Sequence, residues 1–383
     1  MTARVLFLDH VGVLGGAELS LLDIARHHAG SSTVALMADG PFGERLRAAG
    51  VRTVLLTASA ATRGLRRESA VPSPAALAGL LGVARAVARL ARAHDVIYAN
   101  SQKAFVVATA AGAAARRPVI WHLRDILSGE HFSRTNVRAV VALANGRAAR
   151  VVANSCATAD AFVGRGGRAG KVRVVYNGID AAAFAAVRDA DAAAARAALG
   201  LGDAPAVGVF GRLSPWKGQH VLLDALPRLP GVHALVVGDA LFGEVDYATG
   251  LRARAAALGV ADRVHFLGFR ADVETLMRVA DVVVHTSVSA EPFGRVIVEG
   301  MLAGRPVVAT RGGGAVEIVR DGETGALVPP EDAARLAAAI AALLRTDAGA
   351  VVAAAGRADA AARFSMDAML AGVSREITEV SGQ

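Results

Sequence analysis

The chain has 383 residues, of which 54% are hydrophobic and 20% charged, so it is too long for one ordinary domain and too apolar to be disordered. A net charge of +8 first suggests a nucleic-acid partner, but the positive charge is almost all arginine, which together with abundant alanine is typical of a GC-rich genome. Aromatic residues make up 4% and do not interleave with basic ones, so we expect no nucleic-acid partner.

Short β-rich runs alternate with longer segments of helical period in the first half, which predicts an α/β domain with a parallel sheet. The expected strands cover residues 5–8, 33–36, 53–56, 96–98, 119–122, 151–153 and 172–175. The expected helices cover residues 16–28, 75–93, 103–114, 136–149 and 156–163. Asn177-Gly178 then marks a turn, and the Ala-rich stretch 180–202 is predicted to be a linker with one helix.

The alternation restarts after this linker, with expected strands at 207–210, 233–237, 264–267, 282–285, 306–309 and 326–328. We therefore expect two doubly wound, Rossmann-like parallel-sheet domains, residues 1–178 and 179–364, that face an interdomain cleft. A last helix near 366–380 lies in the segment 365–383, which we expect to pack on either domain, including back on the first.

The single cysteine, Cys156, rules out an internal disulfide and fits a reducing compartment, and we expect it to be a small buried packing residue. The first residues do not resemble a signal peptide, and the longest apolar stretch, 104–115, is too short to cross a bilayer. We therefore expect a cytoplasmic protein, and leave open a peripheral contact with the inner face of the membrane.

The most specific segment covers residues 287–314, where Glu291 and Glu299 bracket Pro292-Phe293-Gly294. Glu291 is expected in the loop after a strand, and a helix is expected to begin near Gly294, with Pro292 helping to set its start. Backbone N–H groups of Phe293, Gly294 and Arg295 at a helix N-terminus offer an anion site, and Glu299 lies one turn further in, where it can accept from a ribose diol.

A second segment, 210–218, follows a buried strand and carries Arg212 and Lys217 on a tight turn. Both side chains have the reach and charge to bind a diphosphate. A third, the Gly-rich turn 12–18 with Gly15 and Gly16, lets backbone N–H groups approach a phosphate, but it is neither a dinucleotide fingerprint nor a Walker loop.

In these motifs the chain resembles the retaining, nucleotide-sugar-dependent glycosyltransferases of family 4, which have the two-domain GT-B fold. The resemblance runs from residue 5 to about 345, in the family's order. It is carried by GGAE at 15–18, NGID at 177–180, GRLSPWKG at 211–218, GD at 238–239, LGF at 267–269 and the two glutamates at 291 and 299. Pro292 and Gly300 depart from the commoner family residues, which affects the choice of sugar rather than the assignment.

The resemblance implies a hexosyltransferase whose second domain binds the donor and whose first domain binds the acceptor. The implied catalytic residues are Glu291, Lys217, Arg212 and His122. The implied donor-binding residues are Gly15, Gly16, Arg212, Lys217, Gly238, Phe293, Gly294, Arg295 and Glu299. His122 matches a family position near the donor sugar's hydroxyls, although a hydrogen-bonded histidine at a strand end explains it as well. Residues 238–242 and 268–270 are expected to read the base and the sugar, whose identity, UDP- or GDP-linked, stays open.

No cofactor and no metal are expected, because the nucleotide sugar is a substrate and the Asp189-Ala190-Asp191 match to a metal-binding pattern lies in the linker helix. A nucleotide-sugar epimerase or phosphorylase of the same fold is the alternative function. No residue is an evident covalent nucleophile. Retention of the anomeric configuration therefore favours attack by the acceptor on the same face of the sugar from which the leaving group departs.

The charge is unevenly distributed, because residues 1–180 carry a net charge of +12 and residues 181–383 one of −4. Three arginine-rich segments contribute to the first value: 63–67, the helix carrying Arg85, Arg89 and Arg92, and 165–173. They are either solvated surface or a site for an anionic acceptor, small or lipid-linked, and for anionic lipid head groups.

Overall fold

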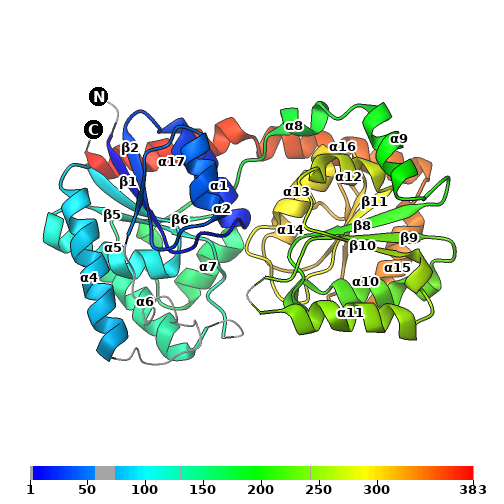
Figure 1. Ribbon diagram of the computed structural model, residues 1–383, viewed down its shortest axis with the longest axis horizontal. Coiled ribbons are helices and arrows are strands. Elements are labelled where there is room, and N and C mark those ends of the chain that lie inside the picture. Colours follow the sequence, from blue (N-terminus) through cyan, green and yellow to red (C-terminus); the bar gives the residue numbers. More distant parts are fainter. Residues whose placement is uncertain (1–2, 57–73, 130–131, 242, 383) are drawn as a thin grey trace. The chain divides into compact units, whose positions relative to one another are not determined.

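The computed structural model describes residues 3–56, 74–129, 132–241 and 243–382. The chain divides into two compact units, Met1–Gly178 together with Asp367–Gln383, and Ile179–Met366 (Figure 1). The predicted arginine cluster at 63–67 and Phe242 lie outside the described residues. Each unit has its own parallel sheet and its own core.

The first unit contains a seven-stranded parallel sheet in the order β3-β2-β1-β4-β5-β6-β7. These strands are Thr53–Leu55, Ser32–Leu36, Val5–Asp9, Val96–Ala99, Val119–Leu123, Arg150–Ala153 and Val172–Val174. The central strands are buried over their whole length, as their continuous apolar runs require of a sheet covered on both faces. The strand order reverses direction between β1 and β4, so the loops after these two strands diverge at the carboxyl edge, where α/β sheets bind ligands.

Helices connect these strands: α1 Gly16–His27, α2 Pro41–Ala48, α4 Pro74–Ala91, α5 Gln102–Ala115, α6 Arg134–Arg147 and α7 Cys156–Gly164. Trp121 of β5 is buried and stacks on Phe105 of α5 with ring centroids 4.5 Å apart. The C-terminal helix α17, Met366–Ser381, packs on this unit (Figure 1). Its buried Met369, Val373 and Ile377 recur every four residues and form one apolar face.

The second unit contains a six-stranded parallel sheet in the order β10-β9-β8-β11-β12-β13. These strands are Val264–Gly268, His233–Val237, Ala206–Phe210, Val282–His285, Val307–Thr310 and Ala326–Val328. Here the order reverses between β8 and β11, which pair in parallel from Val207 and Val282 onward. The loops after β8 and β11 therefore flank the position where a ligand is expected.

The helices of this unit are α8 Ala181–Ala185, α9 Asp189–Ala198, α10 Gln219–Ala225, α11 Val245–Ala257, α12 Val273–Val279, α13 Arg295–Leu302, α14 Ala315–Ile318, α15 Ala333–Leu343 and α16 Asp347–Arg363. Within the described residues no single helix is long and apolar enough to cross a bilayer. The pair α15 and α16 reaches that length and composition only together, across a bend of 94°.

The predicted fold, two Rossmann-like parallel-sheet arrays, is confirmed, and most strands begin and end within one residue of their expected positions. Three expectations need correction. Helix α2 was not expected, the linker has two helices rather than one, and Cys156 is exposed rather than buried. Cys156 is exposed because it is the first residue of α7, directly after the N-cap Ser155, with its Sγ 3.5 Å from the hydroxyl of Tyr176.

Candidate active site

Two predicted catalytic residues meet where the strand order of the second unit reverses. Lys217 ends a 3-10 turn, Pro215–Lys217, in the loop after β8, and Glu291 lies in the loop after β11. The Nζ of Lys217 donates to Oε2 of Glu291 at 2.6 Å and lies 4.1 Å from the ring centre of Trp216. A residue from each side of the switch point therefore forms one ion pair.

Further donors surround the Glu291 carboxylate. Nε2 of His285 lies 3.2 Å from its Oε2, and the Ser287 hydroxyl donates to the same oxygen at 3.0 Å. The Ser287 hydroxyl also lies 3.0 Å from the His285 ring. Burial by itself would raise the pKa of Glu291, but the Lys217 charge and the His285 contact outweigh it and hold that pKa well below its ordinary value. Glu291 is therefore a carboxylate at neutral pH.

The glycines at 312–314 allow the backbone around Glu291 to pack this closely. The N–H of Gly314 donates to the carbonyl of Glu291 at 2.7 Å. A Cβ at Gly313 would come within 2.1 Å of that same carbonyl oxygen, and Gly313 has a φ of 57°. Only glycine fits here, which explains why the sequence signal around Glu291 includes a run of three glycines.

Helix α13 starts directly after this loop and places the second predicted glutamate. Gly294 is its N-cap with a φ of 103°, so the helix begins at Arg295, one residue after the expected position, and Pro292 lies outside it. Glu299 lies one turn further on and pairs with Arg295 at 3.2 Å between Nη2 and Oε1. Phe293 turns inward against Phe364, with ring centroids 5.6 Å apart, so only its backbone is left to face a ligand.

Arg212 occupies the other side of the β8 loop. Its Nε lies 3.5 Å from Oε2 of Glu244, and Ser214 donates to Oε1 of the same carboxylate at 2.5 Å. Sequence analysis did not identify Glu244, because it lies 32 residues further along the chain and has no motif of its own. Arg212, like Lys217, is thus held by a carboxylate in this structure.

The weak glycine motifs of the second unit come together at one point. A Cβ at Gly238 would lie 2.0 Å from the carbonyl oxygen of Gly211, and the N–H of Gly238 donates to the carbonyl of Gly268 at 2.8 Å. Gly211, Gly238 and Gly268 all have positive φ values. The loops after β8, β9 and β10 therefore touch through their backbones, which places the predicted base- and sugar-reading segments next to the Arg212 turn.

The glycine-rich turn of the first unit leads into α1, whose N-cap is Gly15. The carboxylate of Glu18 accepts from the N–H of Gly15 at 3.0 Å, which is the half of a capping box that a glycine N-cap allows. Burial and the nearby Asp9 carboxylate raise the pKa of Glu18 to about 7. Sequence analysis missed the role of Glu18, although its position three residues after the cap is a recognised signal. The N–H groups of Gly15 and Glu18 already bind the Glu18 carboxylate, so of the two predicted glycines Gly16 is the one whose amide can face a phosphate.

His122 lies inside β5 and has no exposed surface. Its Nδ1 is 2.5 Å from the Tyr98 hydroxyl, and burial keeps its pKa well below the ordinary value. Burial argues against direct contact with a sugar in this conformation and favours the hydrogen-bonded histidine that we weighed as the other explanation. The predicted contact with the donor stays a prediction.

A buried arginine that sequence analysis missed lies two residues further on. Arg124 donates to the Asn177 side chain at 2.7 Å, to the Ser20 hydroxyl at 3.0 Å and to the Asn100 side chain at 3.0 Å. Asn100 in turn donates to the buried Asp9 carboxylate at 2.6 Å. This network joins the carboxyl edge of the sheet to the NGID turn, and it explains the asparagine of that motif.

No group of three or more potential metal ligands gathers anywhere in the described ranges. The two carboxylates of the pattern at 189–191 are both held by arginines, Asp189 by Arg278 and Asp191 by Arg188. Asp189 begins α9, as expected for a linker helix. The structure therefore gives this pattern a role in ion pairing.

Both halves of the chain match known families. Residues 15–178 match the family described as glycosyl transferase 4-like domain, and residues 191–358 match glycosyl transferases group 1. The solved structure of Anabaena Alr3699/HepE in complex with UDP-glucose is 43% identical, with a TM-score of 0.89 over 99% of both chains. Its complex with UDP and glucose gives a TM-score of 0.91 over 98% of this chain and 99% of that one, at 42% identity.

Curated relatives match over part of the chain. The D-inositol 3-phosphate glycosyltransferase of Mycobacterium marinum is 41% identical over 216 residues, which cover 54% of this chain and 46% of that protein. The enzyme of the same name from Mycobacterium bovis is 40% identical over 222 residues. The match thus spans less than half the length of these relatives.

Proposed function

Because this chain belongs to the family-4-type glycosyltransferases with the GT-B fold, and is therefore a transferase, we propose that it is a retaining hexosyltransferase that uses a nucleotide diphosphate sugar and no metal ion. The observation that carries the proposal is the Lys217–Glu291 pair at the switch point of the second unit. UDP-glucose is the first donor to test, because the Anabaena protein is solved in complex with it.

Lys217 and Arg212 bind the donor diphosphate in this proposal. Each is held by a carboxylate in the structure, Lys217 by Glu291 and Arg212 by Glu244, so both cations are already positioned before the donor arrives. The donor phosphates are stronger, multivalent partners and take over these contacts in part. Two fixed cations supply the charge that a metal ion supplies in other transferases.

Glu299 and the start of α13 bind the nucleoside and the phosphates. Glu299 is only partly buried and accepts from Arg295, which leaves its second oxygen for a ribose hydroxyl. The backbone N–H groups of Phe293, Gly294 and Arg295 lie at the positive end of the helix dipole and support the diphosphate. Gly238 and the touching loops beside it contact the base or the sugar.

The first unit contributes Gly16 and the glycine turn around Gly15 to the donor phosphates, and His122 is retained as the proposed neighbour of the sugar hydroxyls.

In the transfer step, the bond from the anomeric carbon to the leaving phosphate breaks and a bond to the acceptor oxygen forms on the same face. The acceptor proton passes to the leaving phosphate oxygen. Glu291 stabilises the positive charge that develops on the sugar, while Lys217 and Arg212 stabilise the negative charge of the leaving group.

The acceptor is anionic in this proposal. Residues 1–180 carry a net charge of +12, and Arg85 and Arg89 are exposed on α4, with the exposed Arg92 directly after the end of this helix. The relatives named as D-inositol 3-phosphate glycosyltransferases indicate one such class, a phosphorylated polyol. A lipid-linked phosphate acceptor at an anionic membrane surface uses the same charges and is tested beside it.

The test measures UDP release from UDP-glucose with no acceptor, with inorganic phosphate, with inositol phosphate, and with anionic vesicles that contain a lipid-linked acceptor. We expect fast release only when an acceptor is present, together with a glycoside whose anomeric proton shows the configuration of the donor. Conversion of the donor without an acceptor would indicate the alternative epimerase. Transfer to inorganic phosphate would indicate the alternative phosphorylase.

A further inference from the structure

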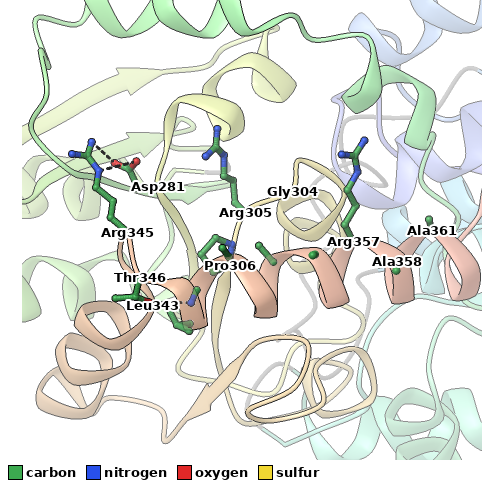
Figure 2. A pocket seen from close by; sticks show the side chains of 14 residues that line it. Asp281, Gly304, Arg305, Pro306, Leu343, Arg345, Thr346, Arg357, Ala358 and Ala361 are labelled. Carbon is green, nitrogen blue, oxygen red and sulfur yellow. Dashed lines mark hydrogen bonds and ion pairs between the residues drawn. The ribbon is translucent and has the colours of Figure 1, made fainter.

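A pocket of about 710 Å³ lies in the second unit at the edge opposite the candidate active site (Figure 2). Asp281 and Pro306 line it, and they directly precede β11 and β12. The pocket is therefore at the amino ends of these parallel strands, whereas Lys217 and Glu291 follow the carboxyl ends of β8 and β11. A molecule bound here would not overlap the donor.

The floor of the pocket is one face of α16, where Arg357 is accompanied only by small residues. The small residues are Gly349, Ala350, Ala353, Ala354, Ala358 and Ala361. Three arginines stand on the same side of this helix, Arg305, Arg345 and Arg357 (Figure 2). The pocket is therefore an open groove that is lined by small side chains on one side and by arginine side chains on the other.

The three arginines differ in how their charge is balanced. Arg345 binds both oxygens of Asp281, each at 3.2 Å, and donates to the carbonyl of Asp203 at 2.6 Å. Arg305 donates to the carbonyl of Arg278, which carries no charge, and its buried Nε has no hydrogen-bond partner. Within the described part of the chain, neither Arg305 nor Arg357 contacts a carboxylate. Two of the three guanidinium groups therefore have no direct ion pair, and Asp281 and Asp189 act on Arg305 only from a distance.

The side chain of Arg357 lies beside the residue that precedes Arg305 in the chain. Gly304 directly precedes Arg305, and Nη1 of Arg357 lies 4.0 Å from where a Cβ on Gly304 would be. A larger residue at 304 would also be strained, since its φ is 70°. Burial, followed by the charge of Arg278, lowers the pKa of Arg305, so its positive charge is poorly solvated here. An anion in the pocket would relieve that cost.

We propose that this pocket is a second ligand site, which takes a small phosphorylated metabolite through the guanidinium groups of Arg305 and Arg357. A guanidinium matches the geometry of a phosphoryl group by donating two parallel hydrogen bonds. The volume is within the range of sites for small molecules, and the alanine floor accepts the uncharged part of the ligand. The site is independent of the proposed transfer reaction, so either proposal can fail without the other.

Hydrogen exchange with inorganic pyrophosphate as the probe tests the site, because it reports where on the chain the probe binds. In the whole protein saturated with UDP, we expect pyrophosphate to slow exchange in the segments 303–306 and 345–358. Arg357→Ala should weaken that effect roughly tenfold or more, since hydrogen bonds to a charged group are lost. Arg305→Lys, which keeps the charge but loses the fork, should weaken it as well.

The matched control is Arg335→Ala, an exposed arginine of α15 in the same unit that pairs with Asp332 of its own N-cap. It should leave the pyrophosphate effect unchanged. The proposal is overturned if pyrophosphate protects only the segments 211–218 and 291–299. It is also overturned if Arg357→Ala, folded as judged by unchanged exchange elsewhere, shows the same protection as the wild type.

Discussion

The ammonium group of Lys217 and the carboxylate of Glu291 form a 2.6 Å ion pair across the β8/β11 switch point, although 74 residues separate them in the chain. The side chain of Glu291 is only 11% exposed, so its charge depends on this partner. The pair therefore links stability to catalysis: the residues proposed to stabilise opposite charges in the reaction stabilise each other before the donor binds.

Lys217→Ala should destabilise the second unit, because it leaves Glu291 buried without its cation. The expected loss is on the order of 3 kcal/mol in the free energy of unfolding. The double variant Lys217→Ala/Glu291→Gln should lose less than the sum of the two single variants, since no unpaired charge remains. Urea unfolding followed by Trp216 fluorescence, in a Trp121→Phe background, measures all four proteins. If the losses in the free energy of unfolding of the two single variants added up to that of the double variant, the two side chains would not be energetically coupled.

The two glutamates should have separable kinetic effects. Glu299→Ala should mainly raise the KM for the donor, because it removes a contact made before and during the reaction. Glu291→Gln should mainly lower kcat, by on the order of a hundredfold for one electrostatic group. Steady-state kinetics with UDP-glucose and an active acceptor measures both, with Glu323→Ala as an exposed control in the same unit. Negligible effects of both changes would remove this loop and helix from the site.

Glu18 should make the first unit less stable as the pH rises. Its folded pKa of about 7 lies above the usual unfolded value of about 4.3, so the folded state binds the extra proton between these values. Glu18→Gln removes the cost of ionisation, and the variant should therefore gain stability over the wild type progressively from about pH 4 to pH 7, with a constant difference at higher pH. Unfolding followed by Trp121 fluorescence in a Trp216→Phe background tests this. A pH-independent difference would contradict the raised pKa.

Tyr98→Phe should destabilise the first unit by about 1–3 kcal/mol, because it leaves Nδ1 of the buried His122 without its partner. The same Trp121 fluorescence measurement detects it. If His122 serves only this pair, Tyr98→Phe should leave the KM for the donor unchanged where the protein is folded. A large rise in that KM, under conditions where the variant is fully folded, would instead favour the predicted contact between His122 and the sugar.

The arrangement of strands was predictable because each buried strand is a short run of β-branched and aliphatic residues, as in β9 and β11, whose limits at 233–237 and 282–285 were predicted without error. Helix α2 was missed because Gly40, Pro41 and Gly43 resemble a loop, yet Pro41 is the first residue of the helix and Gly40 its cap. Cys156 was placed wrongly because its type favours burial, whereas its position at the start of α7 decides its exposure.

The residues of the candidate site were largely identifiable from motifs, but their partners were not. Glu244, His285 and Ser287 reach Arg212 and Glu291 only through the fold and carry no pattern of their own. The direct contact between Lys217 and Glu291 follows from strand order, which periodicity does not specify. The same holds for Arg124, whose partners come from α1, from the loop after β4 and from the NGID turn.

Acceptor-dependent transfer from UDP-glucose tests the central claim most directly. Purified protein is mixed with UDP-glucose and an anionic acceptor, and the anomeric configuration of the product is read by proton NMR while UDP release is followed. The account predicts UDP release that requires the acceptor, a product with the donor's anomeric configuration, and the loss of both in Glu291→Gln. Inverted configuration, or undiminished transfer by Glu291→Gln, would contradict it.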